Sequence, residues 1–322
     1  FSCKDALDTV TSDPYTEIQK ALSINPSALE NYAAQGKPAY VNKDNTGPNA
    51  ITDKAATLGR VLFYDKNLST NNTIACASCH KQEFAFGDTA ISSLGVENGR
   101  TERHSMRLIN TRYANEAKFF WNERAASLEA QTTMPIVDHL EMGFSGQTGR
   151  GNITSLLTKL NGIGYYKELF TLAYGDATIT EARMQTALAQ FIRSIQSFDS
   201  KYDIGRAQVG NDGAPFPNFN AQENAGKNLF LAPPIFNAAS ERIGGGFGCQ
   251  GCHQAPEFDI DPNSRNNGFI GVIVSLRNSS NGKSSTIRGS RSSGNCTTRL
   301  RSSSSPAALL ASGCVASAAV SA

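Results

Sequence analysis

The chain has 322 residues, of which 39% are hydrophobic and 18% are charged, and its formal net charge is +2. This length suffices for one large domain or for two medium ones with real cores. The small net charge gives no support for a nucleic-acid or polyanionic partner. The sequence contains no run of eighteen apolar residues, so we expect no transmembrane helix.

Residues 1–50 are predicted to form a polar leader or tether. A helix is expected to begin after Asp13-Pro14 and to end at Asn25-Pro26, and a second short helix is expected over 27–34. The opening Phe1-Ser2-Cys3 resembles the end of a bacterial lipoprotein signal peptide, which would make Cys3 an acylated membrane anchor. The alternative is a terminal or buried cysteine that carries no modification.

The rest of the chain reads as helices separated by long loops. An apolar stripe predicts a helix over 52–66, capped by Thr52 or Asp53, and the stretch 84–103 is expected to be irregular. Further helices are predicted over 125–135 (stopped by Pro135), 153–160, 165–174, 180–203 (capped by Thr180) and 221–230. Strand signals are nearly absent, so we predict an all-α protein.

Four of the seven cysteines lie in two C-x-x-C-H units, Cys76-Ala77-Ser78-Cys79-His80 and Cys249-Gln250-Gly251-Cys252-His253. Two thiols at this spacing can form thioethers with the two vinyl groups of haem, and the histidine that follows becomes the proximal iron ligand. A zinc half-site or a redox pair would need further Cys or His partners or a βαβ setting, and the sequence supplies neither. Covalent haem attachment in bacteria takes place outside the cytoplasm, which implies export.

An internal repeat supports two haem domains. Leu58-Gly59-Arg60-Val61-Leu62-Phe63 precedes the first motif much as Ala225-Gly226-Lys227-Asn228-Leu229-Phe230 precedes the second. We therefore predict a first haem domain over 51–215 and a second over 216–322. The tail from about residue 275 has no acidic residue, histidine, methionine or aromatic residue. It is either disordered, because it cannot bury enough apolar area, or its residues are not the true sequence.

Only four histidines are present. His80 and His253 are the predicted proximal ligands, and only His104 and His139 remain for any second axial position. We therefore expect at least one iron to keep an open or differently ligated position, which is a chemical rather than a purely electron-transferring site.

Several segments resemble the bacterial dihaem cytochrome c peroxidase family, which includes the tryptophan-oxidising dihaem enzymes of methylamine utilisation. The resemblance rests on Leu58–Asp65, Leu68-Ser69, Ile74–His80, Phe119–Ala125 and Glu141-Met142-Gly143, and in the second half on the second motif and Val274–Asn278. It covers roughly residues 50–278 and implies two cytochrome c-like haem domains.

The resemblance also implies roles for individual residues. The haem at His80 would be the peroxidatic one, and the haem at His253 would receive electrons. Trp121, the only tryptophan, would lie between the haems as a stepping point for electrons, although a core aromatic is the alternative. Glu141 would be the distal acid that takes a proton from peroxide and returns it, the alternative being a surface or capping glutamate.

The chain departs from the family pattern at three places. The family position of a distal histidine falls near Val96, so the first haem is expected to be five-coordinate. His104 stands where the family often has an asparagine that binds calcium, so calcium is in question, and His104 or Met106 could instead reach the distal pocket or be structural. The second haem usually takes a Met or Tyr ligand from beyond residue 278, and this chain has neither there.

The resulting hypothesis is a peroxidase that reduces hydrogen peroxide with electrons from a small cytochrome c or copper protein. It would reside in the periplasm or on the surface of a Gram-negative bacterium, anchored through Cys3, and could form a homodimer. The alternatives are a dihaem oxidase of a protein or organic substrate, a non-catalytic electron-transfer cytochrome, and a haem-bearing subunit of a larger assembly.

Overall fold

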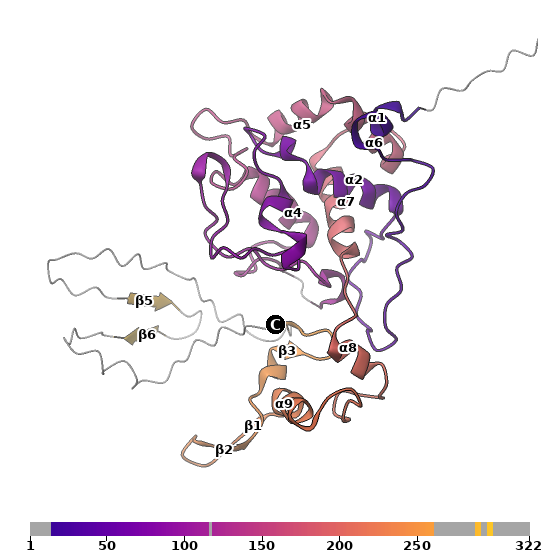
Figure 1. Ribbon diagram of the computed structural model, residues 1–322. Helices are drawn as coiled ribbons and strands as arrows, with labels where there is room; N and C mark the ends of the chain where they lie inside the picture. Colours follow the sequence, from indigo (N-terminus) through magenta and orange to yellow (C-terminus); the bar gives the residue numbers. More distant parts are fainter. Residues whose placement is uncertain (1–13, 116–117, 261–286, 291–294, 299–322) are drawn as a thin grey trace, which may run out of the picture. The chain divides into compact units, whose positions relative to one another are not determined.

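The computed structural model describes residues 14–115, 118–260, 287–290 and 295–298 (Figure 1). Residues 14–260 belong to one compact unit, and 287–290 and 295–298 belong to a second. The predictions on Cys3 and on Val274–Asn278 fall outside the described residues, and of the tail only two short backbone segments are described.

Helices dominate the larger unit. They are α1 (Thr16–Leu22), α2 (Asp53–Tyr64), α3 (Cys76–Cys79), α4 (Leu128–Val137), α5 (Ile153–Asn161), α6 (Gly164–Tyr174), α7 (Glu181–Ser194), α8 (Lys201–Arg206) and α9 (Ala221–Leu231). Short 3-10 turns occur at Lys66–Leu68, Gln82–Phe84, Val96–Asn98, Thr111–Tyr113 and Cys249–Gly251. The predicted irregular stretch 84–103 is confirmed.

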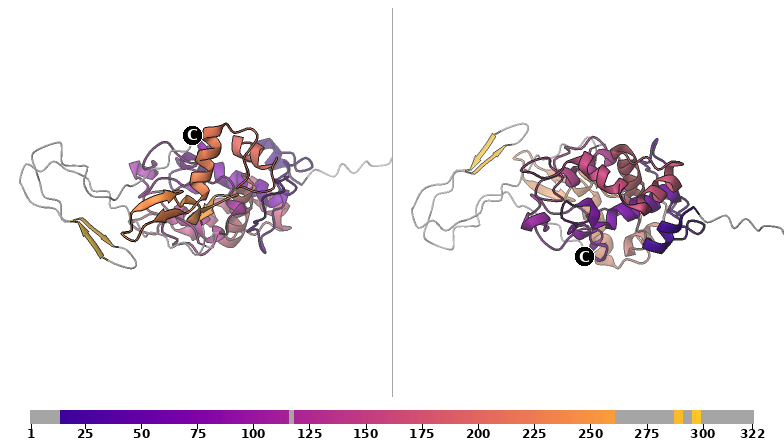
Figure 2. Two further views of the ribbon diagram at one scale, coloured as in Figure 1. Left: turned by 90° about the horizontal axis from the view of Figure 1, so that it is seen from below. Right: turned by 90° about the horizontal axis from the view of Figure 1, so that it is seen from above.

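The described residues contain three short antiparallel hairpins as well as the helices, so the prediction of an all-α protein is confirmed only as a mostly-α one. β1 (Pro234–Phe236) pairs with β2 (Arg242–Gly245), β3 (His253–Gln254) with β4 (Asp259–Ile260), and β5 (Ile287–Ser290) with β6 (Asn295–Thr298). Figure 2 gives two further views of these elements. The hairpins are too short to show the alternating pattern by which a strand is recognised in sequence.

The core is built around α2 and α7, which lie side by side (Figure 1). Both helices begin at the predicted caps: the hydroxyl of Thr52 accepts from the amide of Ala55 at 3.2 Å, and that of Thr180 accepts from the amide of Arg183 at 3.2 Å. The helices approach so closely that a Cβ on Gly59 would lie 2.0 Å from the carbonyl oxygen of Ala187. Their backbones therefore touch.

The predicted helix over 27–34 is wrong. The carboxylate of Asp53 accepts hydrogen bonds from the amides of Tyr32 and Ala33 at 2.8 Å each, and the Asn31 side chain accepts from the amide of Ala34 at 2.9 Å. These amides point at side chains rather than along a helix. Side-chain oxygens of Asn and Asp compete with the backbone carbonyls that would accept these hydrogen bonds in a helix.

The predicted helix over 125–135 is misplaced at both ends. It begins at Leu128, because the hydroxyl of Ser127 accepts from the amide of Ala130 at 3.1 Å. It continues past Pro135, although a proline removes one helical bond. The carbonyls of Pro135 and Ile136 accept from the amides of Met142 and Phe144 at 3.2 and 3.0 Å, so tertiary contacts hold the last turn.

The helix predicted over 180–203 is two helices, because α7 ends at Ser194 and α8 begins at Lys201. Asn110 holds the intervening backbone in an extended conformation. Its amide donates to the carbonyl of Ile195 at 3.0 Å, and its side chain bonds both the amide and the carbonyl of Ser197 at 2.9 Å.

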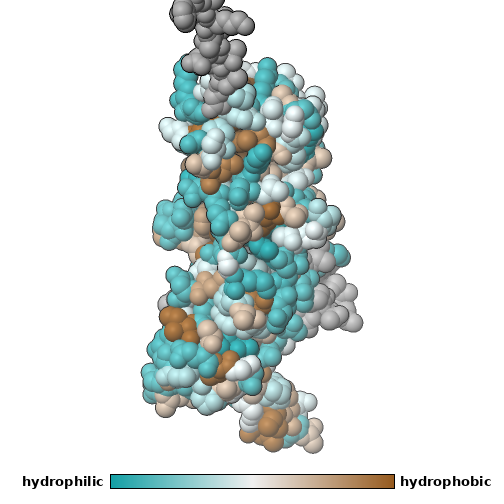
Figure 3. All heavy atoms as spheres, turned by 90° about the vertical axis from the view of Figure 1, so that its right-hand side faces the viewer, coloured by the Kyte–Doolittle hydropathy of each residue, from teal (hydrophilic) through white to brown (hydrophobic). Residues whose placement is uncertain are grey.

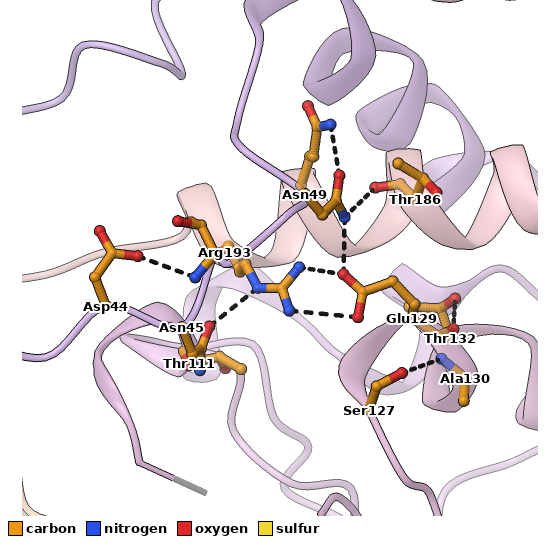
Figure 4. A network of polar contacts seen from close by, with 12 residues as sticks. Asp44, Asn45, Asn49, Thr111, Ser127, Glu129, Ala130, Thr132, Thr186 and Arg193 are labelled. Carbon is orange, nitrogen blue, oxygen red and sulfur yellow. Dashed lines mark hydrogen bonds and ion pairs between the residues drawn. The ribbon is translucent and has the colours of Figure 1, made fainter. Parts of the chain in front are cut away.

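The leader is joined to the core by a partly buried polar network (Figure 4). Arg193 of α7 pairs with Glu129 of α4, and its Nε donates to the Asn45 side chain at 3.0 Å. In the Asn49 side chain, Nδ2 donates to the Glu129 carboxylate at 2.8 Å and Oδ1 accepts from the Gln190 side chain at 2.8 Å. Burying this ion pair is tolerated because its polar atoms are bonded.

Among the described residues, no helix is long and apolar enough to cross a membrane. On the face shown in Figure 3, hydrophobic side chains form several small, separate groups between hydrophilic ones.

The repeated glycine positions give a matched test of helix packing. Gly59 of α2 touches a neighbouring backbone, whereas a Cβ on its repeat counterpart, Gly226 of α9, would have no described atom within 4 Å. We expect Gly59→Ala to lower the free energy of unfolding by about 2 kcal/mol, since overpacking outweighs the gain in helix propensity. Gly226→Ala should leave it unchanged or raise it by up to ~1 kcal/mol. Urea unfolding followed by circular dichroism measures both; equal effects would contradict the packing argument.

Candidate active site

The first C-x-x-C-H motif is held in place by local hydrogen bonds. The buried hydroxyl of Ser69 accepts from the amides of Thr73 and Ile74 at 3.1 and 3.0 Å, which turns the chain into α3. The amide of His80 then donates to the carbonyl of Cys76 at 2.9 Å. The two thiols and the imidazole are thus fixed relative to each other by a single helical turn.

The ring of His80 is oriented for metal binding through one nitrogen. Its Nδ1 lies 2.9 Å from the carbonyl oxygen of Phe86, which assigns the proton to Nδ1 and makes Nε2 the nitrogen that can coordinate. Burial lowers the pKa of His80, which favours the neutral, coordinating form. The backbone of Met106 also lies within hydrogen-bonding reach of His80.

The loop that follows His80 is tied down by Asp88. Its carboxylate accepts from the ammonium of Lys81 at 2.8 Å and from the hydroxyl of Ser93 at 2.6 Å. The Ser93 hydroxyl also lies 2.8 Å from that of Ser105, a residue of the cavity wall. Although burial opposes ionisation, these bonds hold the pKa of Asp88 well below its usual range.

Cys76, Cys79 and His80 line a cavity of about 1120 Å³, measured with its open mouth. Its apolar walls come from α2 (Phe63), α7 (Leu188 and Ile192) and α4 (Pro135). The predicted residues His104, Met106, Trp121 and Glu141 line the same cavity.

The donor set facing this cavity suits covalent haem attachment. Burial raises the pKa of the Cys76 thiol to about 12 and that of Cys79 to about 11, so both remain neutral thiols beside a neutral imidazole. Within the described ranges, no group of three or more His, Cys, Asp or Glu side chains is placed to hold a metal ion. The thiol spacing, the oriented imidazole and the apolar walls together fit a haem.

Glu141 reaches the cavity from a turn that is packed against another loop. The amide of Val96 donates to the carbonyl of Glu141 at 2.9 Å. A Cβ on Gly95 would lie 1.9 Å from the carbonyl oxygen of Leu140, so only glycine permits this close approach. The turn is further bonded to the end of α4, since the amides of Leu140 and Glu141 donate to the Asp138 carboxylate at 2.8 and 3.1 Å.

The environment of Glu141 favours a protonated carboxyl group. Burial is the largest cause and the negative charge of Asp138 the second, and together they raise the pKa of Glu141 to about 7. The positive charge of Arg124 partly opposes this shift. A carboxyl group with this pKa can both accept and donate a proton near neutral pH.

Trp121 lies on the cavity wall and is 51% exposed, so the alternative of a buried core aromatic does not describe it. Its indole Nε1 donates to the carbonyl of His104 at 2.8 Å. The loop is closed by an antiparallel bridge between Phe119 and Ala125, and the Arg124 guanidinium lies 3.5 Å from the centre of the Phe120 ring. Trp121 is therefore fixed at one edge of the cavity.

His104 and Met106 also lie on this wall. The Nδ1 of His104 is 2.9 Å from the carbonyl oxygen of Ala90, which satisfies one ring nitrogen. His139, the other histidine left for a second axial position, is bonded to the Ser145 hydroxyl at 2.9 Å and is not among the residues that line the cavity. Sequence reasoning missed the charged wall residues Glu102, Arg124 and Asp138, and Arg103 also lines the cavity. No spacing in the sequence distinguishes such wall residues from surface charges.

The second motif has a different environment. Cys249 begins a 3-10 turn and is partly buried, Cys252 is exposed, and His253 is exposed on β3. None of the second motif's residues belongs to the wall of the cavity described above. The structure therefore brings the first motif together with Glu141 and Trp121, and leaves the second motif at a separate place.

Comparison with known proteins finds similarity to dihaem peroxidases. The family model described as di-haem cytochrome c peroxidase matches residues 53–209. The chain is 34% identical over 155 residues to the methylamine utilisation protein MauG of Methylophilus methylotrophus, covering 48% of this chain and 44% of that protein. It is 29% identical over 223 residues to cytochrome c551 peroxidase of Nitrosomonas europaea, covering 69% and 57%. The chain spans about half the length of the curated relatives it matches.

Two solved structures are similar to this chain in fold. A MauG-like protein associated with microbial copper homeostasis superposes with a TM-score of 0.51 at 26% identity, covering 61% of this chain and 54% of that one. The diheme peroxidase BthA of Burkholderia thailandensis shares the fold, with a TM-score of 0.50 at 20% identity over 71% of this chain and 59% of that chain. Residues 53–209, about half of the chain, are thus similar to the di-haem cytochrome c peroxidase family.

Proposed function

We propose that the protein is a dihaem peroxidase that reduces hydrogen peroxide to water with electrons from a small redox protein. The observation that carries this proposal is the meeting of Cys76, Cys79, His80 and Glu141 on one cavity. An attachment site for an iron cofactor and a group able to transfer protons near pH 7 thus face the same space.

In this proposal Cys76 and Cys79 bind the first haem covalently, and Nε2 of His80 coordinates its iron. Cys249, Cys252 and His253 do the same for the second haem. A bound haem supplies iron that can change its redox state and can bind a small oxidant at an open position. The protein contributes the apolar walls, the fixed imidazole and the groups that handle protons.

Glu141 is the proposed catalytic acid and base. Its carboxylate oxygen accepts a proton from one oxygen of peroxide and delivers it to the oxygen that leaves as water. The packing of its turn on Gly95 and Val96 keeps the carboxyl group at the cavity wall through the transfer. Arg103 and Arg124, on the same wall, are suited to stabilise negative charge that develops there.

Electrons enter at the second site and reach the first by way of Trp121. This assignment follows the predicted division into a peroxidatic domain over 51–215 and an electron-receiving domain over 216–322. The donor is a small cytochrome c or copper protein that meets the chain in the periplasm or at the cell surface, since covalent haem attachment takes place outside the bacterial cytoplasm. The described residues add no support for calcium, a lipid anchor or a homodimer.

A second candidate is oxidation of a protein or organic substrate at the same site. It is favoured by the 34% identity to MauG and by the half-exposed position of Trp121 on the cavity wall. Turnover of peroxide with a reduced cytochrome, compared with oxidation of a candidate protein substrate, distinguishes the two activities.

The haem assignment predicts a stoichiometry. The chain should carry two covalent haems, and the serine pairs Cys76→Ser/Cys79→Ser and Cys249→Ser/Cys252→Ser should each remove one. Cyanide should bind only to proteins that keep the first site, which are the wild type and the Cys249→Ser/Cys252→Ser variant. A pyridine haemochrome assay, intact mass and an optical titration measure these outcomes, and a wild-type mass equal to the bare polypeptide would end the proposal.

The role of Glu141 predicts a large kinetic effect. Replacing it by the isosteric Glu141→Gln should lower kcat by about 10²-fold or more, because general acid–base catalysis contributes roughly 10²–10⁴. Glu102→Gln, on the same cavity wall, is the matched control and should retain most of the activity. Steady-state oxidation of reduced cytochrome c by peroxide measures both, and equal losses would remove Glu141 from the mechanism.

The pH profile should follow the Glu141 carboxyl group. Proton removal needs the ionised form, so kcat/KM should rise as pH increases through about 7. Asp138→Asn should move this midpoint to lower pH, because the charge of Asp138 raises the pKa of Glu141. Its Oδ1 can still accept the amides of Leu140 and Glu141, so the turn is kept. A midpoint that is unchanged, or that moves upward, would show that another group controls the profile.

A further inference from the structure

The leader makes a set of contacts with the segment that follows the second motif. The amide of Asn42 donates to Oε1 of Glu257 at 3.1 Å. The ammonium of Lys43 lies 3.4 Å from Oε2 of Glu257 and also bonds Oδ1 of Asp259. Residues more than two hundred positions apart are thereby joined.

This ion cluster is largely removed from water. The side chains of Glu257 and Asp259 are only 3% and 5% exposed, and that of Lys43 is 16% exposed. Among the described residues, the ion pairs of both carboxylates are made with Lys43. Two buried carboxylates without a cation would repel each other and would lack compensation for lost hydration. Lys43 is therefore the charge on which the cluster depends.

Asp259 of this cluster contacts residues that are close in sequence to both proposed redox sites. Asp259 pairs across the β3–β4 hairpin with Gln254, the residue after His253. Its second oxygen, Oδ2, accepts from the amide of Asn115 at 2.7 Å. Asn115 lies six residues before Trp121 in the sequence. One carboxylate thus connects the leader, the hairpin that carries His253 and the loop that leads to Trp121.

Neighbouring leader residues reinforce the same junction. Asp44 accepts two hydrogen bonds from the Arg112 guanidinium, at 2.6 and 3.0 Å, and the Asn45 side chain donates to the carbonyl of Thr111 at 2.8 Å. Tyr40 donates to the Asp203 carboxylate of α8 at 2.7 Å. The leader is therefore bonded on both sides of Lys43, which restricts where its ammonium can lie.

We propose that Lys43 is a positioning residue that holds the His253 hairpin against the loop leading to Trp121, and so sets the rate of electron transfer between the two sites. The electron-transfer part rests on the proposed dihaem function. Electron transfer slows steeply as redox centres separate, so loosening this junction should slow the step between the sites without changing either site.

The test compares Lys43→Met, which keeps the length of the side chain but removes its charge, with Lys43→Arg, which restores the charge. Lys54→Met is the matched control, because Lys54 is exposed on α2 and has no ion pair in the described structure. Lys43→Gln serves if the Met variant does not fold. Each is studied as the full-length, haem-loaded protein.

Two measurements are made on each variant. Hydrogen–deuterium exchange of the peptides covering 253–260 should be at least about tenfold faster in Lys43→Met, since a buried pair has lost one partner. Stopped-flow absorbance should show inter-site electron transfer slowed by about tenfold or more, because small displacements of reacting groups have large effects on rate. The optical spectra of both haems should stay unchanged. Lys43→Arg should recover most of both effects, and Lys54→Met should show neither.

Each outcome decides a separate point. Unchanged exchange in Lys43→Met would overturn the structural role of the cluster. Faster exchange with an unchanged electron-transfer rate would overturn the positioning role while leaving the contact intact. A wild-type protein that transfers no electron between its sites would instead refute the proposed function, and the exchange result would still judge the cluster.

Discussion

The backbone contact between α2 and α7 at Gly59 positions apolar side chains that line the site. α2 contributes Phe63 to the cavity and is followed, after the 3-10 turn Lys66–Leu68, by α3 with the first C-x-x-C-H motif, while α7 contributes Leu188 and Ile192. The contact between the two helices therefore fixes the relative positions of the apolar side chains that both supply to the cavity. A side chain at Gly59 would force the helices apart and would change the packing that the cofactor itself must complete.

The loops around the site are held by hydrogen bonds rather than by apolar packing. Asp88 fixes the loop after His80, Asp138 fixes the turn that carries Glu141, and Asn110 holds the extended chain between α7 and α8. Each uses a short side chain whose oxygen accepts from backbone or side-chain donors close to it. Long loops around a cofactor cavity have little apolar area to bury, so such bonds determine where their functional groups lie.

The sequence predicted those features that follow from local spacing. The two motifs, the caps Thr52 and Thr180, and the amphipathic faces of α2, α5, α6 and α7 could all be found in this way. The gathering of Glu141, Trp121, His104 and Met106 on one wall was expected only from the family resemblance. What could not be predicted depends on distant partners: Asp53 capturing the amides of Tyr32 and Ala33, Asn110 ending α7, and Lys43 meeting Asp259. The wall residues Glu102, Arg124 and Asp138 belong to the same group, since only the fold brings them to the cavity.

The leader changes where the folded unit begins. The family match starts at residue 53, yet Asn45 and Asn49 satisfy the buried Arg193–Glu129 pair and Gln190, and Lys43 neutralises Glu257 and Asp259. A version of the protein cut back to the matched boundary would leave an arginine, three carboxylates and a glutamine inside the molecule without some or all of their partners. Sequence similarity thus marks the part of the chain that relatives share, whereas the boundary for expression, crystallisation or domain exchange lies further toward the N-terminus, before α1, whose Ile18 is buried in the core.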